Sequence, residues 1–350
     1  MSKNVFKIGI DIGNKNLKVC GEAGFPHEIP VAYEEIKEDE YYRETTGTET
    51  EKVFYNGKYY FVGLQCNRGL PQNKGSKSVR EVANMFKLVG IAREMRRVGV
   101  NNNKGEFYVV TGTPVEDYDA YVQDYIDLMK TPGSDYEKIE LNGVEYQIKV
   151  LDVDVTKQSA CVAPTIPNWK ESEFILVDFG GGTLDVAHFK NGVRIMYRTL
   201  GFPLNEALSE LRNELNIYGL GLPRANALDS GFIKIMEDVV MEGKYRNVTT
   251  IQVGEEKKDL KEFSNMWLQN KVDTIIEDIK IRLNLSETDS KSIPVYYIGG
   301  GAKLLNEILT KNTGFANKKI IDPPHFVNVN IYHAIANNKN WSNKTEVEVM

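Results

Sequence analysis

The sequence predicts an α/β protein built from two similar halves. Two segments carry the same pattern, since Phe6–Val19 reads FKIGIDIGNKNLKV and Phe174–Val186 reads FILVDFGGGTLDV. In each, an apolar run ends in Asp-x-Gly, and the chain then returns as a second apolar strand. The two aspartates, Asp11 and Asp178, are separated by 178 − 11 = 167 positions, close to half of the 350 residues. A pattern repeated at this spacing indicates an internal duplication, and strand groups that alternate with helices are typical of the α/β class.

Three Asn-Gly pairs mark the turns of expected β-hairpins. Between alternating apolar and polar residues this pair is a strong hairpin signal, because both residues accept the positive φ angles of a type I′ turn. The pairs are Asn56-Gly57, Asn142-Gly143 and Asn191-Gly192. The third follows the second repeat directly, so a three-stranded meander is expected there.

Helices are expected between these strand groups. Apolar residues recur at helical spacing in 78–98, again behind Pro203, and in the longer segment 259–285. After the long segment we expect a strand over 294–298 and a helix that opens at Ala302. The first domain should comprise residues 1–165 with 323–350 and the second 166–322, with a cleft between them.

Composition excludes several classes of protein. The chain has 43 Lys and Arg against 49 Asp and Glu, and 43 − 49 gives a net charge of −6, which argues against a broad basic face for nucleic acid. No apolar stretch approaches the roughly 18 residues of a membrane span. Three widely spaced cysteines without a Cys/His cluster fit reduced thiols. We therefore expect a cytoplasmic protein that binds neither DNA nor membranes directly.

Two related loops are the candidate phosphate-binding sites. The first consists of Gly13, Asn14, Lys15 and Asn16, and the second of Gly180, Gly181, Gly182 and Thr183. Successive glycines let backbone N–H groups converge on one anion. A lone Gly-Gly-Gly is more often a flexible turn, but two related loops on either side of one cleft would hold a phosphate chain from both sides.

Charged residues beside these loops are candidates for binding a metal ion and phosphate. Asp11 and Asp178 each end an apolar strand, where a buried carboxylate needs a partner, and magnesium with its shell of water suits oxygen ligands. Lys18 is a candidate phosphate contact, with a surface salt bridge as the alternative.

A third glycine-rich turn lies near the end of the chain. Gly299, Gly300, Gly301 and Ala302 connect a strand to a helix, which permits close approach of the backbone to a ligand. The sequence lacks both GxxxxGK[ST] and a strand followed by GxGxxG, so a P-loop or Rossmann enzyme is disfavoured.

Together these motifs resemble the actin-like ATPase superfamily, which includes actin, heat-shock chaperone ATPase domains and sugar kinases. The matching segments are 8–19, 175–186 and 295–305. The resemblance implies two related ribonuclease-H-like α/β domains that flank a nucleotide cleft. Asp11-x-Gly-Asn-x-Asn-x-Lys18 and the tail 322–332 are most similar to ParM-type plasmid-segregation actins.

The resemblance also implies roles for individual residues. The two loops and Lys18 would hold the phosphates, Asp11 and Asp178 would orient Mg²⁺ and its waters, and 299–302 would lie against the adenosine. Gln158 occupies the position that orients the attacking water, where ParM-type proteins have Glu. A glutamine orients water but is not a general base, so slow turnover is expected.

Further adenosine contacts are expected on two helices. Glu277 and Lys280 match the spacing by which chaperone ATPases hold adenosine, although an exposed ion pair explains the spacing equally well. Asn205 and Glu206 are additional candidates.

The function implied by the resemblance is a slow ATPase that assembles into head-to-tail filaments. ATP or ADP with Mg²⁺ would be the cofactors, with GTP as an alternative nucleotide, and the partners would be further copies of the chain and a DNA-binding adaptor of a plasmid partition complex. A small-molecule kinase of the same fold and an MreB-like cytoskeletal protein are the alternatives.

Overall fold

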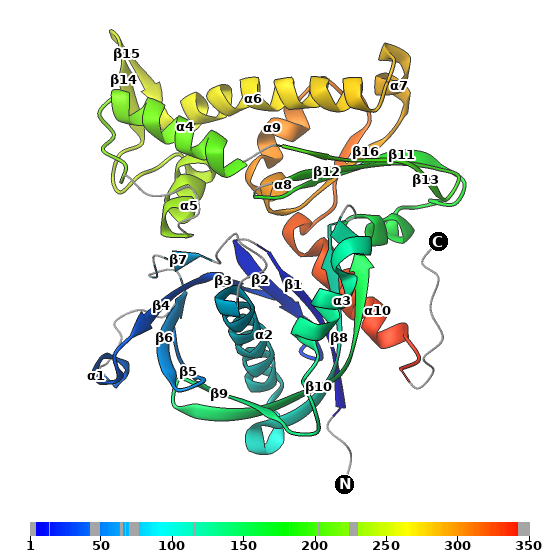
Figure 1. Ribbon diagram of the computed structural model, residues 1–350. Helices are drawn as coiled ribbons and strands as arrows, with labels where there is room; N and C mark the ends of the chain where they lie inside the picture. Colours follow the sequence, from blue (N-terminus) through cyan, green and yellow to red (C-terminus); the bar gives the residue numbers. More distant parts are fainter. Residues whose placement is uncertain are drawn as a thin grey trace. The chain divides into compact units, whose positions relative to one another are not determined.

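The computed structural model describes residues 5–13, 15–42, 50–63, 66, 68–69, 77–114, 117–181, 183–201, 204–223 and 230–341 (Figure 1). The chain divides into two compact units. Unit 1 contains residues 1–161 and 328–350, and unit 2 contains residues 162–327. These bounds lie within a few residues of the domain limits expected from the sequence. Both units combine a sheet with helices, which confirms the predicted α/β class.

Within the described ranges, unit 1 contains one mixed sheet of ten strands in the order β3-β2-β1-β8-β10-β9-β5-β6-β4-β7. Its strands are β1 (Val5–Ile12), β2 (Asn16–Cys20), β3 (His27–Pro30), β4 (Ala32–Ile36), β5 (Thr50–Tyr55), β6 (Lys58–Gly63), β7 (Arg68–Gly69), β8 (Lys104–Thr113), β9 (Glu137–Leu141) and β10 (Val144–Lys157). The neighbours β1, β8 and β10 are parallel, so their carboxyl ends meet at one edge of the sheet.

The helices of unit 1 are α1 (Glu38–Tyr41), α2 (Lys77–Val98), α3 (Tyr118–Met129) and α10 (Val327–Asn338). Helix α2 lies inside the curve of the sheet (Figure 1). Its apolar side chains at Met85, Phe86, Leu88 and Val89 are buried on several faces, as expected for a helix enclosed by a sheet. Even Lys87 is fully buried, and its Nζ lies 2.9 Å from Glu137.

Helix α10 packs directly on the backbone of β1. A Cβ atom at Gly9 would lie 2.6 Å from the backbone nitrogen of His333 and 2.6 Å from the carbonyl oxygen of Val329. Only glycine permits this approach, so the packing of α10 depends on Gly9, a residue near the N-terminus of the chain.

Unit 2 contains a five-stranded sheet in the order β13-β12-β11-β16-β17 and the separate hairpin β14-β15, counted over its described residues. The strands are β11 (Glu173–Phe179), β12 (Leu184–Lys190), β13 (Val193–Leu200), β14 (Thr250–Val253), β15 (Glu256–Asp259), β16 (Val295–Ile298) and β17 (Lys318–Ile320). The helices are α4 (Leu204–Ile217), α5 (Ser230–Glu237), α6 (Leu260–Arg282), α7 (Glu287–Ser292), α8 (Gly300–Leu304) and α9 (Asn306–Lys311). Every helix in the described ranges is too short or too polar to traverse a lipid bilayer.

The predicted hairpins and helices are confirmed, except that the helix expected to open at Ala302 begins at Gly300. Each Asn-Gly pair joins two antiparallel strands, β5 to β6, β9 to β10 and β12 to β13, and all six turn residues have positive φ. The second repeat forms the expected meander β11-β12-β13. The long helix is α6, whose capping residue Asp259 accepts a hydrogen bond from the N–H of Glu262 at 3.0 Å. Pro203, expected at the start of α4, lies outside the described residues.

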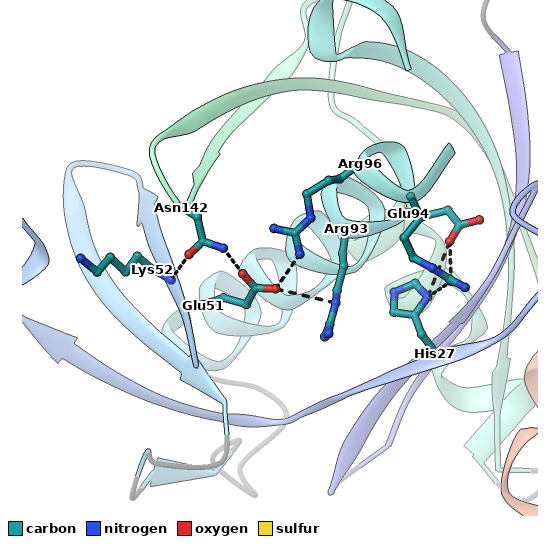
Figure 2. A network of polar contacts seen from close by, with 8 residues as sticks. His27, Glu51, Lys52, Arg93, Glu94, Arg96 and Asn142 are labelled. Atoms are coloured by element: carbon teal, nitrogen blue, oxygen red, sulfur yellow. Dashed lines mark hydrogen bonds and ion pairs between the residues drawn. The ribbon is translucent and has the colours of Figure 1, made fainter. Parts of the chain in front are cut away.

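A network of charged side chains fastens α2 to its surroundings (Figure 2). Glu51 on β5 lies 3.0 Å from Arg96 and 3.7 Å from Arg93, and it also accepts a bond from Asn142. At the other end of the network, the N–H of Ala23 donates to Glu94. These contacts therefore tie α2 to β5 and to the turn that follows β2.

The same network holds His27 in its neutral form. The Nδ1 atom of His27 accepts a hydrogen bond from Arg97 Nη1 at 2.6 Å and lies 3.6 Å from Glu94. Burial, followed by the charges of Arg97, Arg93 and Arg96, lowers the pKa of His27 from 6.5 to about 3.

We predict that acid destabilises unit 1 through His27. Below pH 6.5 the unfolded chain binds a proton that the folded histidine does not, so stability falls as the pH decreases from 6.5 toward 3. The free energy of unfolding should drop by about 2 kcal/mol between pH 7.5 and 5. In His27→Asn, which keeps an acceptor near the Nδ1 position but does not titrate, this drop should disappear from urea denaturation curves. His188→Asn serves as the control and should retain it; an equally steep loss in His27→Asn would contradict the assignment.

Candidate functional site

In unit 1 the predicted residues gather at the carboxyl ends of the parallel strands. Asp11 is 5% exposed at the end of β1. Its Oδ2 lies 3.4 Å from Lys18 Nζ on β2, and its Oδ1 accepts a hydrogen bond from Gln158 Nε2 at 3.3 Å. Both distances are at the long end of the hydrogen-bonding range. The structure thus brings a carboxylate, a cation and an amide into one polar cluster.

The turn between β1 and β2 forms the first candidate loop. The N–H of Gly13 donates to the carbonyl of Asn16 at 3.1 Å, and the carbonyl of Lys15 accepts from the N–H of Val31. The side chain of Asn16 donates to Glu28 on the neighbouring strand β3 at 2.9 Å. The Asn16 amide is thus engaged with the sheet. Asn14 lies outside the described residues.

Gln158 follows β10 and is held at the same edge. Its N–H donates to the carbonyl of Thr113 at the end of β8, at 2.9 Å. A Cβ atom at Gly112 would lie 2.9 Å from Gln158 Cγ and 1.9 Å from the hydroxyl oxygen of Tyr332 on α10. The missing side chain at Gly112 therefore makes room for both residues, a relation that the sequence pattern did not reveal.

In unit 2 the second aspartate lies against the third glycine turn. Asp178 is 9% exposed near the end of β11. A Cβ atom at Gly299 would stand 2.3 Å from Asp178 Oδ1 and 2.5 Å from the carbonyl oxygen of Phe179. Gly299 also adopts φ 93° and ψ 168°, a backbone region that is essentially restricted to glycine. The turn 299–302 and the second loop are thus parts of one site.

The second loop is closed by its own backbone and covered by α4. The N–H of Gly180 donates to the carbonyl of Thr183 at 2.9 Å. The carbonyl of Gly181 accepts from the N–H of Asn205 at 3.3 Å, and a Cβ atom at Gly181 would lie 3.5 Å from the Asn205 amide nitrogen. Gly182 lies outside the described residues.

Helices α4 and α8 meet behind these turns. A Cβ atom at Gly301 would lie 2.8 Å from Phe179 Cβ and 3.2 Å from Leu204 Cδ2. Gly300 has open space around its α-carbon, whereas Ala302 is fully buried. Gly300 is thus the position of this turn where a ligand can approach most closely.

Glu277 and Lys280 form an ion pair with each other. Lys280 Nζ lies 2.7 Å from Glu277 Oε1, and the Glu277 side chain is 62% exposed. Lys280 also lies over the ring of Phe315, 5.7 Å from its centroid. The geometry agrees with the ion pair, which was one of the two interpretations of this spacing. The other interpretation, an adenosine contact, stays a prediction.

The donor set fits magnesium bound through water. Among the described residues there is no group of three or more His, Cys, Asp or Glu that would enclose a metal ion. Mg²⁺ keeps most of its waters and uses only one or two protein carboxylates together with phosphate oxygens. A single buried carboxylate, Asp11 in unit 1 and Asp178 in unit 2, is compatible with that chemistry, and a magnesium site at either residue stays a prediction.

Comparison with known proteins identifies the family. Residues 9–160 match the family described as the N-terminal domain of actin-like proteins, and residues 173–330 match the Alp7A C-terminal domain. The chain belongs to the actin-like proteins. The chain has the actin-like fold. No match was found among curated proteins.

Solved structures of actin-like proteins share the fold at low sequence identity. The crystal structure of Alp7A superposes with a TM-score of 0.71 at 16% identity, covering 95% of this chain and 96% of Alp7A. A Bacillus thuringiensis ParM with ATP gives 0.64 at 13% identity, covering 95% and 98%. The Alp12 filament structure gives 0.59 at 15% identity, also covering 95% and 98%.

We predict that Gly299→Ala destabilises unit 2 by roughly 3 kcal/mol, because the added methyl group combines a forbidden backbone conformation with a collision against Asp178. Gly219→Ala is the matched control, since Gly219 also has positive φ but open space around its α-carbon. It should cost only about 1–2 kcal/mol. Denaturant unfolding of the two variants measures the difference, and equal losses would show that Gly299 and Asp178 are not in close contact.

Proposed function

We propose that this actin-like protein is a slow ATPase that assembles into filaments, and that the filaments disassemble after ATP is hydrolysed. The observation that carries the proposal is the duplicated site, in which a buried aspartate at a strand end accompanies a glycine-containing loop in each unit. The ParM with ATP and the Alp12 filament support nucleotide binding and self-assembly for a chain of this fold.

Several groups of the proposed site would bind the phosphates of the nucleotide. Lys18, held at the edge of the sheet beside Asp11, supplies a positive point charge for phosphate oxygens. Backbone N–H groups of the two loops complete the phosphate contacts. Bound magnesium supplies positive charge that offsets the charge of the phosphates.

Gln158 orients the attacking water in this proposal. Its amide is 3.3 Å from Asp11 and its backbone is fixed to β8, so the side chain is placed at the carboxyl edge of the sheet. A neutral amide takes up no proton at neutral pH, so hydrolysis rests on positioning and on electrostatic stabilisation. Slow hydrolysis is therefore expected.

We further propose that the filament serves plasmid segregation. Head-to-tail assembly through one repeated interface leaves open ends, and a DNA-binding adaptor protein would attach to such an end. An acidic chain with a net charge of −6 suits this indirect link to DNA.

The proposal predicts nucleotide-gated polymerisation. Purified protein should sediment with Mg²⁺ and ATP, and less with ADP or without nucleotide, while phosphate release proceeds in parallel. GTP in place of ATP tests nucleotide preference. Protein that stays soluble at every concentration and hydrolyses ATP only when a small acceptor is added would instead identify a small-molecule kinase.

Replacing Gln158 should separate assembly from hydrolysis. In Gln158→Ala, phosphate release should fall about 100-fold, within the range for losing one group that positions a reactant, while ATP-dependent sedimentation persists for longer. Gln147→Ala is the control, because Gln147 lies on β10, the strand that Gln158 follows, and its side chain bonds only to Glu145 within the described residues. Unchanged turnover in Gln158→Ala would show that another residue orients the water.

A further inference from the structure

Asn205 carries an unsatisfied polar atom next to the second loop. The residue is 7% exposed, and its Oδ1 has no hydrogen-bond donor among the described residues. Buried polar atoms in native proteins are nearly always paired, because an unpaired one loses its hydration without compensation. The atom therefore needs an explanation from outside the folded chain.

The position of Asn205 directs this atom toward the glycine turns. Asn205 is the second residue of α4, and its N–H is bonded to Gly181. Its Oδ1 would lie 3.6 Å from a Cβ atom at Gly181, so the amide stands where a side chain at that loop position would point. Leu204, the residue before it, packs beside Gly301. The start of α4 thus touches both glycine turns of unit 2.

The chemistry of the atom restricts its partner. A carboxamide oxygen only accepts hydrogen bonds, so a phosphate oxygen at neutral pH cannot satisfy it. The N-terminal end of a helix also carries a partial positive charge that disfavours a bare cation there. A neutral O–H donor meets both requirements.

We propose that Asn205 is a nucleotide-binding residue whose Oδ1 accepts a hydrogen bond from an O–H group of the bound magnesium–nucleotide complex. Two groups in that complex have the required chemistry, a ribose hydroxyl and a water of the magnesium shell. The inference rests on the proposed function, because it takes the ligand of the second loop to be a nucleotide. It assigns a contact from α4, in addition to those of the loop backbone.

The arrangement has an unusual consequence for stability. Removing the amide should not destabilise the ligand-free protein, because no bond is lost and an unpaired buried atom is removed. It should weaken the complex with nucleotide. A residue with a purely structural role would show the opposite pattern.

The test measures binding and stability of Asn205→Leu, which keeps the volume of the side chain, and of Asn205→Ala. Without nucleotide, Asn205→Leu should unfold at the same temperature as wild type or higher. Its affinity for ATP with Mg²⁺, measured by isothermal titration calorimetry, should fall about tenfold. Asn213→Ala is the matched control, because Asn213 lies on the exposed face of the same helix and its side chain, among the described residues, accepts hydrogen bonds only from its neighbour Arg212.

Modified ligands distinguish the two donors. If a ribose hydroxyl is the donor, 2′-deoxyATP or 3′-deoxyATP should bind the variants and wild type equally. If a magnesium-bound water is the donor, the difference between variants and wild type should vanish when Mg²⁺ is removed with EDTA.

If Asn205→Leu and Asn205→Ala bind ATP as tightly as the wild-type protein does, the inference is overturned and the proposed function is left intact. A loss that is the same for ATP, for both deoxynucleotides and without Mg²⁺ would also overturn it. Wild-type protein that fails to bind ATP or GTP would remove the proposed function and this inference together.

Discussion

A carboxylate buried at the end of a strand must have a partner, and both units are organised around one such group. In unit 1 the partners of Asp11 are Lys18, which lies opposite it on β2, and Gln158, the residue that follows β10. In unit 2 the surroundings of Asp178 are set by the close approach of Gly299. The neighbouring strands and glycine turns keep these oxygens close to polar groups while they are shielded from water.

The glycines contribute because they lack a side chain, and not because their backbone is flexible. At Gly112, Gly299 and Gly301 the space of a side chain is filled by neighbouring atoms, among them Gln158, Asp178 and Phe179. In each unit the residues around these glycines are thus packed like a protein interior, which fixes the direction in which their side chains point.

Local features were predictable from the sequence, and long-range ones were not. The Asn-Gly turns and the periodicity of α2 and α6 depend on neighbouring residues, and the structure confirms them. The insertion of β5, β6, β4 and β7 beyond β9, by contrast, depends on pairings such as Val53 with Leu141 that no local signal encodes. At the site, the duplicated motif pointed to Asp11 and Asp178, and the structure places Gln158 and Lys18 beside the first. The space at Gly112 and the unpaired oxygen of Asn205 depend on tertiary packing, which spacing alone does not reveal.

The order of the units along the chain has a consequence for biosynthesis. Unit 2 is encoded between the two parts of unit 1, and α10, which packs on β1 at Gly9, is made after it. Domains fold as their sequence becomes available during translation. Unit 2 can complete its fold on the ribosome while the large sheet of unit 1 still lacks its covering helix. A nascent or prematurely ended chain would therefore present a complete unit 2 together with a strand β1 that lacks the helix packed on Gly9.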